Sequence, residues 1–227
     1  MFAIDHAATA LLLKRRYPDV GMTPLLISVQ SMELAWVGLN YLGLERTIAD
    51  DPVRSVADIH LTYMPFSHSV GTAAGAALVA WLLIEKGFGR RAMGRAVGLG
   101  IISHLVLDLA THAHDIVLWP GSVQPRLGLG LYATAPFVAF LVELVYGMGC
   151  WFVYRGSRGL LVLIVLGNLA NVSFLSPTVP GPEHYLANRP MLVVSVVFVQ
   201  IVTTLVLVFV LSRRRPRAAT VPHSVHR

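Results

Sequence analysis

The sequence has little charge and almost no cysteine. Asp, Glu, Lys and Arg make up 13% of its 227 residues, whereas a soluble domain carries about 25%. Cys150 is the only cysteine, which excludes an intramolecular disulfide, a zinc finger and a thiolate cluster. The first apolar run, residues 2–13, is followed rather than preceded by basic residues. We therefore expect no secretory signal peptide.

Long apolar runs take the place of the missing charge, and 55% of the residues are hydrophobic. A membrane-spanning helix needs about 20 apolar residues. By this rule the sequence predicts spans over residues 22–42, 69–84, 92–111, 130–153, 160–175 and 191–211. Residues 2–13 are too short to cross, and we interpret them as a half-inserted or interfacial helix.

The predicted fold class is therefore all-α. We expect a polytopic transmembrane helical bundle of about five to six spans plus a short N-terminal half-inserted helix. Residues 1–212 are predicted to form a single membrane-embedded helical domain, because no polar segment is long enough to fold alone. Residues 213–227 are predicted to be a basic, disordered tail.

Lys and Arg divide unevenly between the two predicted membrane faces. One face has only Arg46, Arg54, Arg126 and Arg189. The other has the remaining basic residues, which are Lys14, Arg15, Arg16, Lys86, Arg90, Arg91, Arg95, Arg155, Arg158, Arg213, Arg214, Arg215, Arg217 and Arg227. This asymmetry predicts a multi-pass membrane protein with its C-terminal tail in the cytoplasm. The net charge of +6 is then topological, and we expect no nucleic-acid partner.

One predicted span carries ionisable residues at helical spacing, in the stretch "SHLVLDLATHAHD". His104, Asp108 and His112 recur every four residues and therefore share one helix face. A His and an Asp four residues apart can hold one cation, and imidazole with carboxylate suits zinc, manganese or iron. The alternative is a hydrogen bond between two buried polar groups. Inside a membrane, where ionisable residues are costly, a functional site is favoured.

Other predicted spans carry polar residues at comparable depth. Counted at about 1.5 Å per residue from the predicted cytoplasmic ends, Glu33, Glu143, Asn168 and Asn171 overlap the level of His104. His6 reaches a similar depth if the first helix enters the bundle. These levels predict one polar cluster near the middle of the membrane, open toward the outer face.

His68 lies in "MPFSHSVG", at the outer start of a predicted span. A helix N-terminus has unpaired N–H groups and a positive dipole end, which favour a neutral imidazole and a nearby anion such as phosphate. The alternative is a solvated histidine at the membrane interface.

With these residues assembled, the sequence resembles the YdjM-like family of inner-membrane proteins, described as metal-dependent hydrolases. The resemblance covers about residues 1–120 and is carried by "IDHAATALLL", "QSMELAW", "PFSHS" and "SHLVLDLATH". Two departures stand out. The family's Pro-Asp-x-Asp motif is reduced here to Glu33, and its "HRGxTHS" is replaced by "HLTYMPFSHS", which leaves the role of His60 open. The family is in turn considered distantly similar to zinc-dependent phospholipase C, which implies phosphoester hydrolysis.

The resemblance and the residues together favour a metal-dependent hydrolase embedded in the membrane. Its expected cofactor is a divalent metal, zinc before manganese or iron, and its expected substrate is a membrane lipid or a lipid-linked phosphate. The predicted metal ligands are His6, Glu33, His68, His104 and Asp108, where Asp108 could bridge to a second ion held by His6. His112 or Glu143 is the predicted general base, and a further role of His114 stays open.

Two alternatives use the same residues. The protein could be an ion- or proton-coupled carrier, since Asp, Glu and His at mid-membrane also serve as proton relays. It could also be a catalytically inactive accessory protein, which would bind no metal. A stretch of small residues from Gly71 to Ala80, "GTAAGAALVA", predicts tight helix contacts within the bundle or a homo-oligomer.

Overall fold

The computed structural model describes residues 1–122, 124–176, 178–179 and 181–213. Apart from Arg213, the predicted basic tail lies outside these described residues. The predicted disorder and cytoplasmic position of that tail remain predictions.

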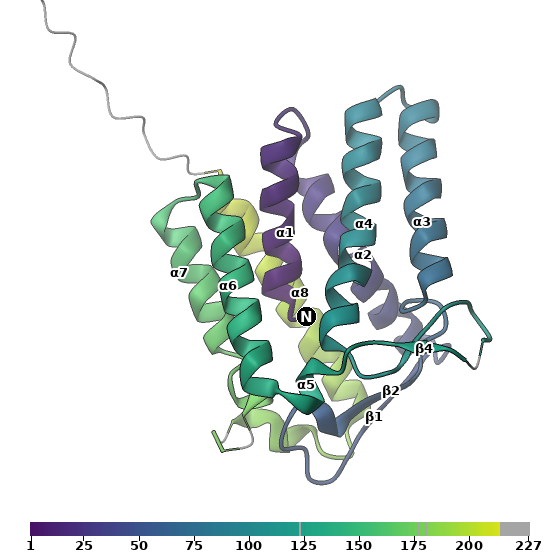
Figure 1. The fold of residues 1–227 in the computed structure, drawn as a ribbon, viewed down its shortest axis with the longest axis vertical. Helices are drawn as coiled ribbons and strands as arrows, with labels where there is room; N and C mark the ends of the chain where they lie inside the picture. The colour runs from purple at the N-terminus through teal and green to yellow at the C-terminus, as the bar shows by residue number, and fades with distance from the viewer. Residues whose placement is uncertain (123, 177, 180, 214–227) are drawn as a thin grey trace, which may run out of the picture.

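The described residues fold into a helical bundle, which confirms the predicted all-α class. Figure 1 shows the helices in chain order. They are α1 Ala3–Arg16, α2 Met22–Tyr41, α3 Val70–Leu82, α4 Arg91–Thr111, α5 Leu131–Thr134, α6 Pro136–Tyr154, α7 Arg158–Leu169 and α8 Pro190–Ser212. A π-helical turn, η2 Leu83–Gly87, extends α3. Each of the six predicted spans contains a helix, so the hydropathy pattern located the elements well.

Four helical segments among the described residues are long and apolar enough to cross a membrane, namely Val70–Gly87, Arg91–Thr111, Pro136–Tyr154 and Pro190–Ser212. The helix Arg158–Leu169 is apolar but shorter. The predicted span 130–153 is divided into α5 and α6 because Pro136 begins a new helix, as proline favours the first helical position. The predicted span 160–175 stops being α-helical at Leu169 and ends in the 3₁₀ helix η3 Ser173–Leu175.

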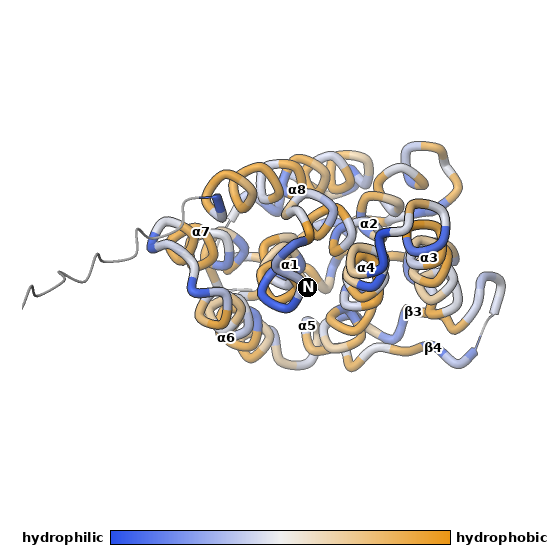
Figure 2. Tube along the Cα trace, turned by 90° about the horizontal axis from the view of Figure 1, so that it is seen from above, coloured by the Kyte–Doolittle hydropathy of each residue, from blue (hydrophilic) through white to orange (hydrophobic). Residues whose placement is uncertain are grey.

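Helix α1 lies at the centre of the bundle, enclosed by α2, α4, α6, α7 and α8 (Figure 2). Its alanines explain how neighbours approach it on all sides, since Ala7, Ala8 and Ala10 are fully buried. At 14 residues it is about 21 Å long, too short to cross the bundle. This position agrees with the half-inserted interpretation and contradicts the interfacial one.

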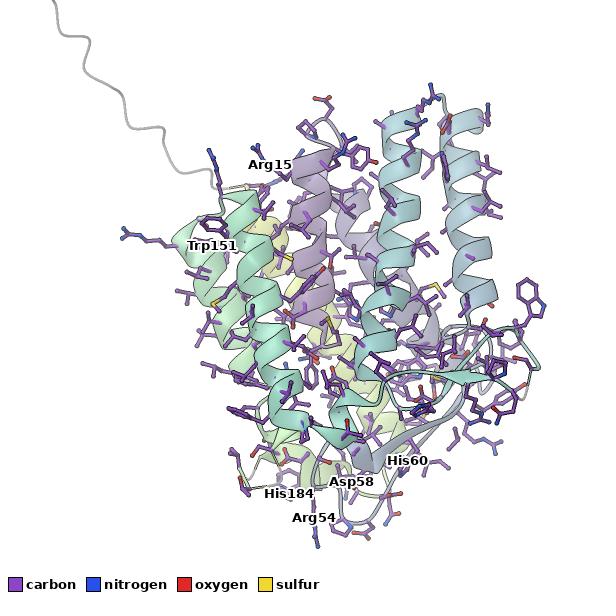
Figure 3. The ribbon with its side chains drawn as sticks, viewed as in Figure 1. Arg15, Arg54, Asp58, His60, Trp151 and His184 are labelled. Carbon is purple, nitrogen blue, oxygen red and sulfur yellow. The ribbon has the colours of Figure 1, made fainter. Side chains whose placement is uncertain are left out.

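The two ends of the bundle differ in both structure and charge. The C-terminal end of α1, the α3–α4 connection and the α6–α7 connection lie at the upper end in Figure 1, and the short strands lie near the lower end. Figure 3 places Arg15 at the upper end and Arg54, Asp58, His60 and His184 at the lower end. The basic segments therefore share one end, as the charge pattern predicted.

The lower end contains two short antiparallel sheets that the sequence did not predict. Strand β1 Arg46–Ala49 pairs with β2 Ile59–Tyr63, and β3 Ile116–Val117 pairs with β4 Arg126–Leu127. The 3₁₀ helix η1 Val56–Asp58 lies between β1 and β2, and η4 Pro182–Leu186 lies in the α7–α8 connection. These strands are too short to show the alternation by which a strand is recognised in a sequence.

The small residues of α3 pack largely against other residues of the same chain. Ala73 and Ala77 are buried in a cluster with Ile101 and Leu105 of α4, and a Cβ on Gly71 would overlap the ring of Trp119. Tight helix contacts within the bundle are therefore present. The predicted homo-oligomer remains a prediction.

We expect the Gly100→Ala substitution to destabilise the contact between α2 and α4. A Cβ at Gly100 would lie 2.0 Å from Ser28 Oγ, and such overpacking costs about 1–3 kcal/mol. Thermal unfolding of the detergent-purified protein should show a lower midpoint temperature. The matched control is Gly75→Ala on α3, where nothing lies within 4 Å of the added Cβ. Equal midpoints for the two variants would contradict the predicted contact.

Candidate metal centre

Four side chains from three segments converge inside the bundle. Glu33 comes from the middle of α2, His68 from the residues just before α3, and His104 and Asp108 from successive turns of α4. One ligand atom of each lies within 4.8 Å of the others. His68, His104 and Asp108 are buried, and Glu33 is 22% exposed.

The separations between these atoms suit a small tetrahedral ion. Glu33 Oε2 lies 3.5 Å from both His68 Nε2 and His104 Nε2. Asp108 Oδ2 lies 3.0 Å from His104 Nε2 and 3.7 Å from His68 Nε2. Zinc binds such ligands at about 2.0–2.1 Å, so tetrahedral ligands lie about 3.4 Å apart. The four residues therefore fit one ion with only small adjustments.

A backbone carbonyl fixes the tautomer of His104. Its Nδ1 lies 3.0 Å from the carbonyl oxygen of Val29. Because a carbonyl only accepts, Nδ1 must carry a proton. In the neutral ring Nε2 then presents a lone pair to the Asp108 oxygen, and two lone pairs at this distance require a cation or an added proton between them.

A serine and a glutamate fix the tautomer of His68 in the same way. Ser67 donates its hydroxyl to Glu45 Oε2 at 2.5 Å, and Ser67 Oγ lies 2.8 Å from His68 Nδ1. Because the Ser67 hydroxyl donates its proton to Glu45, its oxygen accepts a hydrogen bond from His68 Nδ1–H. His68 Nε2 then carries a lone pair that faces the cluster. Glu45 also accepts hydrogen bonds from the backbone N–H groups of Phe66 and Ser67 at 2.9 and 2.8 Å. This glutamate therefore fixes the backbone of the turn that precedes α3.

Sequence reasoning gave Glu45 no role in the site. The glutamate lies 22 residues before Ser67 in the chain, and no motif spacing links the two. Only the pairing of β1 and β2, which folds the 46–63 segment back on itself, brings them together.

The cluster contains buried polar atoms that the described residues do not satisfy. His68 Nε2, His104 Nε2 and Asp108 Oδ2 have no hydrogen-bond partner among the described residues. Buried polar atoms are nearly always paired, because leaving one unpaired costs free energy. Three such atoms facing a common centre are what a cation site requires, so the residues fit a divalent metal.

His6 lies on the other side of Asp108. Its Nε2 is 3.2 Å from Asp108 Oδ1, and its ring stacks on that of His104 at 4.0 Å between centroids. The Met1 nitrogen and the Thr111 hydroxyl are close to the same region, with Met1 N 2.7 Å from Oδ1 and 2.8 Å from Thr111 Oγ1. Asp108 thus presents Oδ2 to His68 and His104 and Oδ1 to His6. A second ion at His6 remains a prediction.

His112 follows the last residue of α4 and lies beside the cluster. Its Nε2 is 3.9 Å from Asp108 Oδ1, and its Nδ1 is 3.4 Å from Asp115 Oδ1. Its ring stacks against that of His68 at 5.3 Å between centroids. Asp115 can therefore hold a proton on Nδ1 and leave Nε2 as an acceptor.

Glu143, the other predicted general base, has different partners. It is fully buried, accepts the Tyr132 hydroxyl at 2.5 Å on Oε1, and accepts the Phe2 N–H at 3.2 Å on Oε2. Burial, reinforced by Glu143, raises the pKa of Tyr132 well above its ordinary value, so the phenol remains a donor. Since both Glu143 oxygens are engaged, its role as a base remains a prediction with less geometric support than that of His112.

The remaining polar residues named from the sequence lie apart from the four-residue group. His60, labelled in Figure 3, is exposed. Its Nε2 lies 2.8 Å from Asp50 Oδ2. His114 is exposed as well. Asn168 lies 3.4 Å from Asp5, and Asn171 accepts from Gln200 at 2.9 Å. The predicted mid-membrane cluster therefore separates into the metal-ligand group and neighbouring hydrogen-bonded pairs.

A cavity of about 760 Å³ adjoins the cluster. Glu33, His6 and His112 line it, together with His60 and Arg126 from the lower end. The ligand group thus borders an accessible space through Glu33, while His68, His104 and Asp108 lie behind its wall.

A protein-family model matches more than half of the chain. The family model described as YdjM inner membrane protein matches residues 51–178. No curated protein and no solved structure matches the chain. The matched region includes His68, His104, Asp108, His112 and Glu143 but begins after His6 and Glu33. It also extends past residue 120 through α6 and α7, beyond the motifs on which the resemblance was based.

Proposed function

This chain belongs to the YdjM inner membrane protein family, and we propose that it is a membrane-bound, metal-dependent hydrolase of a phosphoester or lipid-linked substrate. The observation that carries this proposal is the set of buried, unsatisfied atoms His68 Nε2, His104 Nε2 and Asp108 Oδ2. They share one centre with Glu33, next to a cavity.

We propose Glu33, His68, His104 and Asp108 as the ligands of the metal, with His6 beside them for a second ion. Two imidazoles and two carboxylates favour zinc and also suit manganese or iron. A divalent cation held there would supply a Lewis acid that polarises a phosphoryl or acyl oxygen and makes water more acidic at neutral pH.

His112 is the residue we assign to proton transfer. It lines the cavity, and Asp115 orients its ring through Nδ1. Its Nε2 can then accept a proton from a water in the cavity and return it to the leaving group, which is the usual role of a histidine base. Glu33, the partly exposed member of the group, lines the same cavity, so a metal held by the group would be accessible to a substrate there.

The position of the site suggests where the substrate comes from. Residues of η1, β2 and β4 line part of the cavity, and these strands lie near the end opposite the basic segments (Figure 1). If the basic end and the tail lie in the cytoplasm, the site is reached from the outer leaflet, where a lipid or lipid-linked phosphate is available.

Purified protein with zinc, tested on phosphatidic acid and phosphatidylglycerol in mixed micelles, is expected to release phosphate or a headgroup. Chelation should stop turnover and added zinc should restore it. His112→Asn should lower turnover about 10²-fold or more, the usual contribution of a general base, with an unchanged metal content.

Absence of turnover on both lipids by metal-loaded protein would contradict the hydrolase proposal. A proton flux in liposomes that survives metal removal would identify a carrier instead.

A further inference from the structure

The cavity beside the candidate metal centre continues as a groove between α7 and α8. From the ligand group it passes the start of α1 and runs along the facing sides of α7 and α8. The α7 side contributes Leu163 and Gly167 of the helix and Ala170 just after its end. The α8 side contributes Val196, Val199, Thr203 and Leu207. The groove is therefore mostly apolar along its length and polar at its end near Glu33. The polar residues along it are the hydrogen-bonded pair Asn171 and Gln200 and the hydroxyl groups of Thr203 and Thr204.

The groove has the length of a lipid chain. Lining residues on α8 run from Val193 to Leu207, which is about 21 Å at 1.5 Å per residue. The hydrocarbon core of a bilayer is about 30 Å thick, so one leaflet contributes about 15 Å. An acyl chain that spans one leaflet fits along α8.

The groove is open on the side that faces the surroundings of the bundle. Val196, Val199 and Leu207 are 43%, 61% and 40% exposed, and all three line the cavity. They recur with Thr203 at intervals of three or four residues and therefore form one stripe on α8. A lipid could move sideways from the bilayer into this stripe without crossing the polar end.

Two buried polar atoms belong to residues at the inner end of the cavity. Trp36 Nε1 and Gln30 Oε1 are buried and have no hydrogen-bond partner among the described residues, and both residues line the cavity. One donor and one acceptor near Glu33 suit the ester or hydroxyl groups of a lipid. Arg126, which also lines the cavity, adds a positive charge for a phosphate.

We propose that the groove between α7 and α8 holds one acyl chain of a lipid phosphate whose headgroup lies at Glu33, His112 and Arg126. The reactive role of that lipid rests on the proposed function, whereas its binding does not require turnover. The combination of an apolar stripe, a continuous cavity and a polar end with one arginine distinguishes an amphiphile from a purely polar substrate.

The test uses phosphatidic acid with a diazirine near the methyl end of one acyl chain. The full-length protein is placed in phosphatidylcholine nanodiscs with this probe, irradiated, and digested for peptide mapping by mass spectrometry. Labelling is expected on α7 and α8 residues of the groove and should be competed by unlabelled phosphatidic acid. Thr203→Trp, which fills the groove, should lower that labelling about tenfold, corresponding to a loss of ~1.4 kcal/mol in binding.

The matched control is Val202→Trp on the same helix. Val202 is 42% exposed but does not line the cavity, so labelling of the groove should persist. Uniform labelling of the outer helices, unaffected by Thr203→Trp, would overturn the proposal. So would an unlabelled groove in a protein that forms dimers, because a second copy would then cover it. Specific labelling without any turnover or bound metal would leave the groove assignment standing and remove only the hydrolase.

Discussion

Replacing Asp108 by Asn is expected to remove tight zinc binding while the bundle stays folded. The two side chains have nearly the same shape, so the packing around Asp108 should be preserved. The amide cannot supply the anionic Oδ2 that faces His68 and His104. Loss of a direct ligand should weaken zinc by more than the ~10–100-fold that loss of a supporting residue causes. Competition against a fluorescent zinc chelator measures the change.

Thermal unfolding provides the second readout for Asp108→Asn. Zinc at about 100 times its dissociation constant should stabilise the wild-type protein by about 2.7 kcal/mol. The same zinc concentration should leave the variant almost unchanged. The conservative control is Asp115→Asn, whose carboxylate contacts His112 but is not among the four grouped residues. Equal stabilisation of wild type and Asp108→Asn by zinc would remove Asp108 from the ligand set.

Replacing Glu45 by Gln is expected to weaken zinc binding although Glu45 does not face the metal centre. Glu45 accepts a hydrogen bond from the Ser67 hydroxyl. The Ser67 oxygen can then accept a hydrogen bond from His68 Nδ1–H. A glutamine offers Ser67 an N–H donor as readily as an acceptor, so the tautomer of His68 is no longer fixed. Supporting partners of metal-binding histidines usually contribute about 10–100-fold in affinity, and zinc titration should show a loss in this range.

The Ser67→Ala variant distinguishes the relay to His68 from a purely structural role of Glu45. Ser67→Ala removes the same relay to His68 but leaves Glu45 bound to the backbone N–H groups of Phe66 and Ser67. It should therefore weaken zinc binding with little change in the unfolding temperature of the metal-free protein. The control is Asp50→Asn at the exposed His60 pair, which should change neither quantity. Unchanged zinc affinity in both Glu45→Gln and Ser67→Ala would refute the relay.

The part of the site that could be predicted from sequence is the part encoded by helical spacing. His104 and Asp108 lie one helical turn apart on α4, and the structure joins them at 3.0 Å. Glu33 and His68 were predicted through membrane depth and a helix start, and the structure brings both to the same centre. Depth alone could not separate Glu143 from this group, because it gives no information on which way a side chain faces around the helix.

The positions of the helices could be predicted from the sequence, whereas their packing and the strand pairing could not. Hydropathy located α2, α3, α4, α6, α7 and α8, since each contains a long apolar run. It did not show that α1 lies at the centre of the bundle, because that depends on the alanines that let its neighbours approach. Nor did it predict β1 and β2, whose pairing positions Glu45 behind His68. Long-range contacts of this kind leave no periodic pattern in the sequence.

The most direct test of the metal centre is the metal content of the untagged wild-type protein, purified in detergent and measured by mass spectrometry beside His104→Ala. The account predicts about one ion per chain, because the four grouped residues meet at one centre, or two ions if His6 holds a second. The ion should be lost in His104→Ala. A wild-type protein that is folded, carries no metal and takes up none from added zinc would contradict the account.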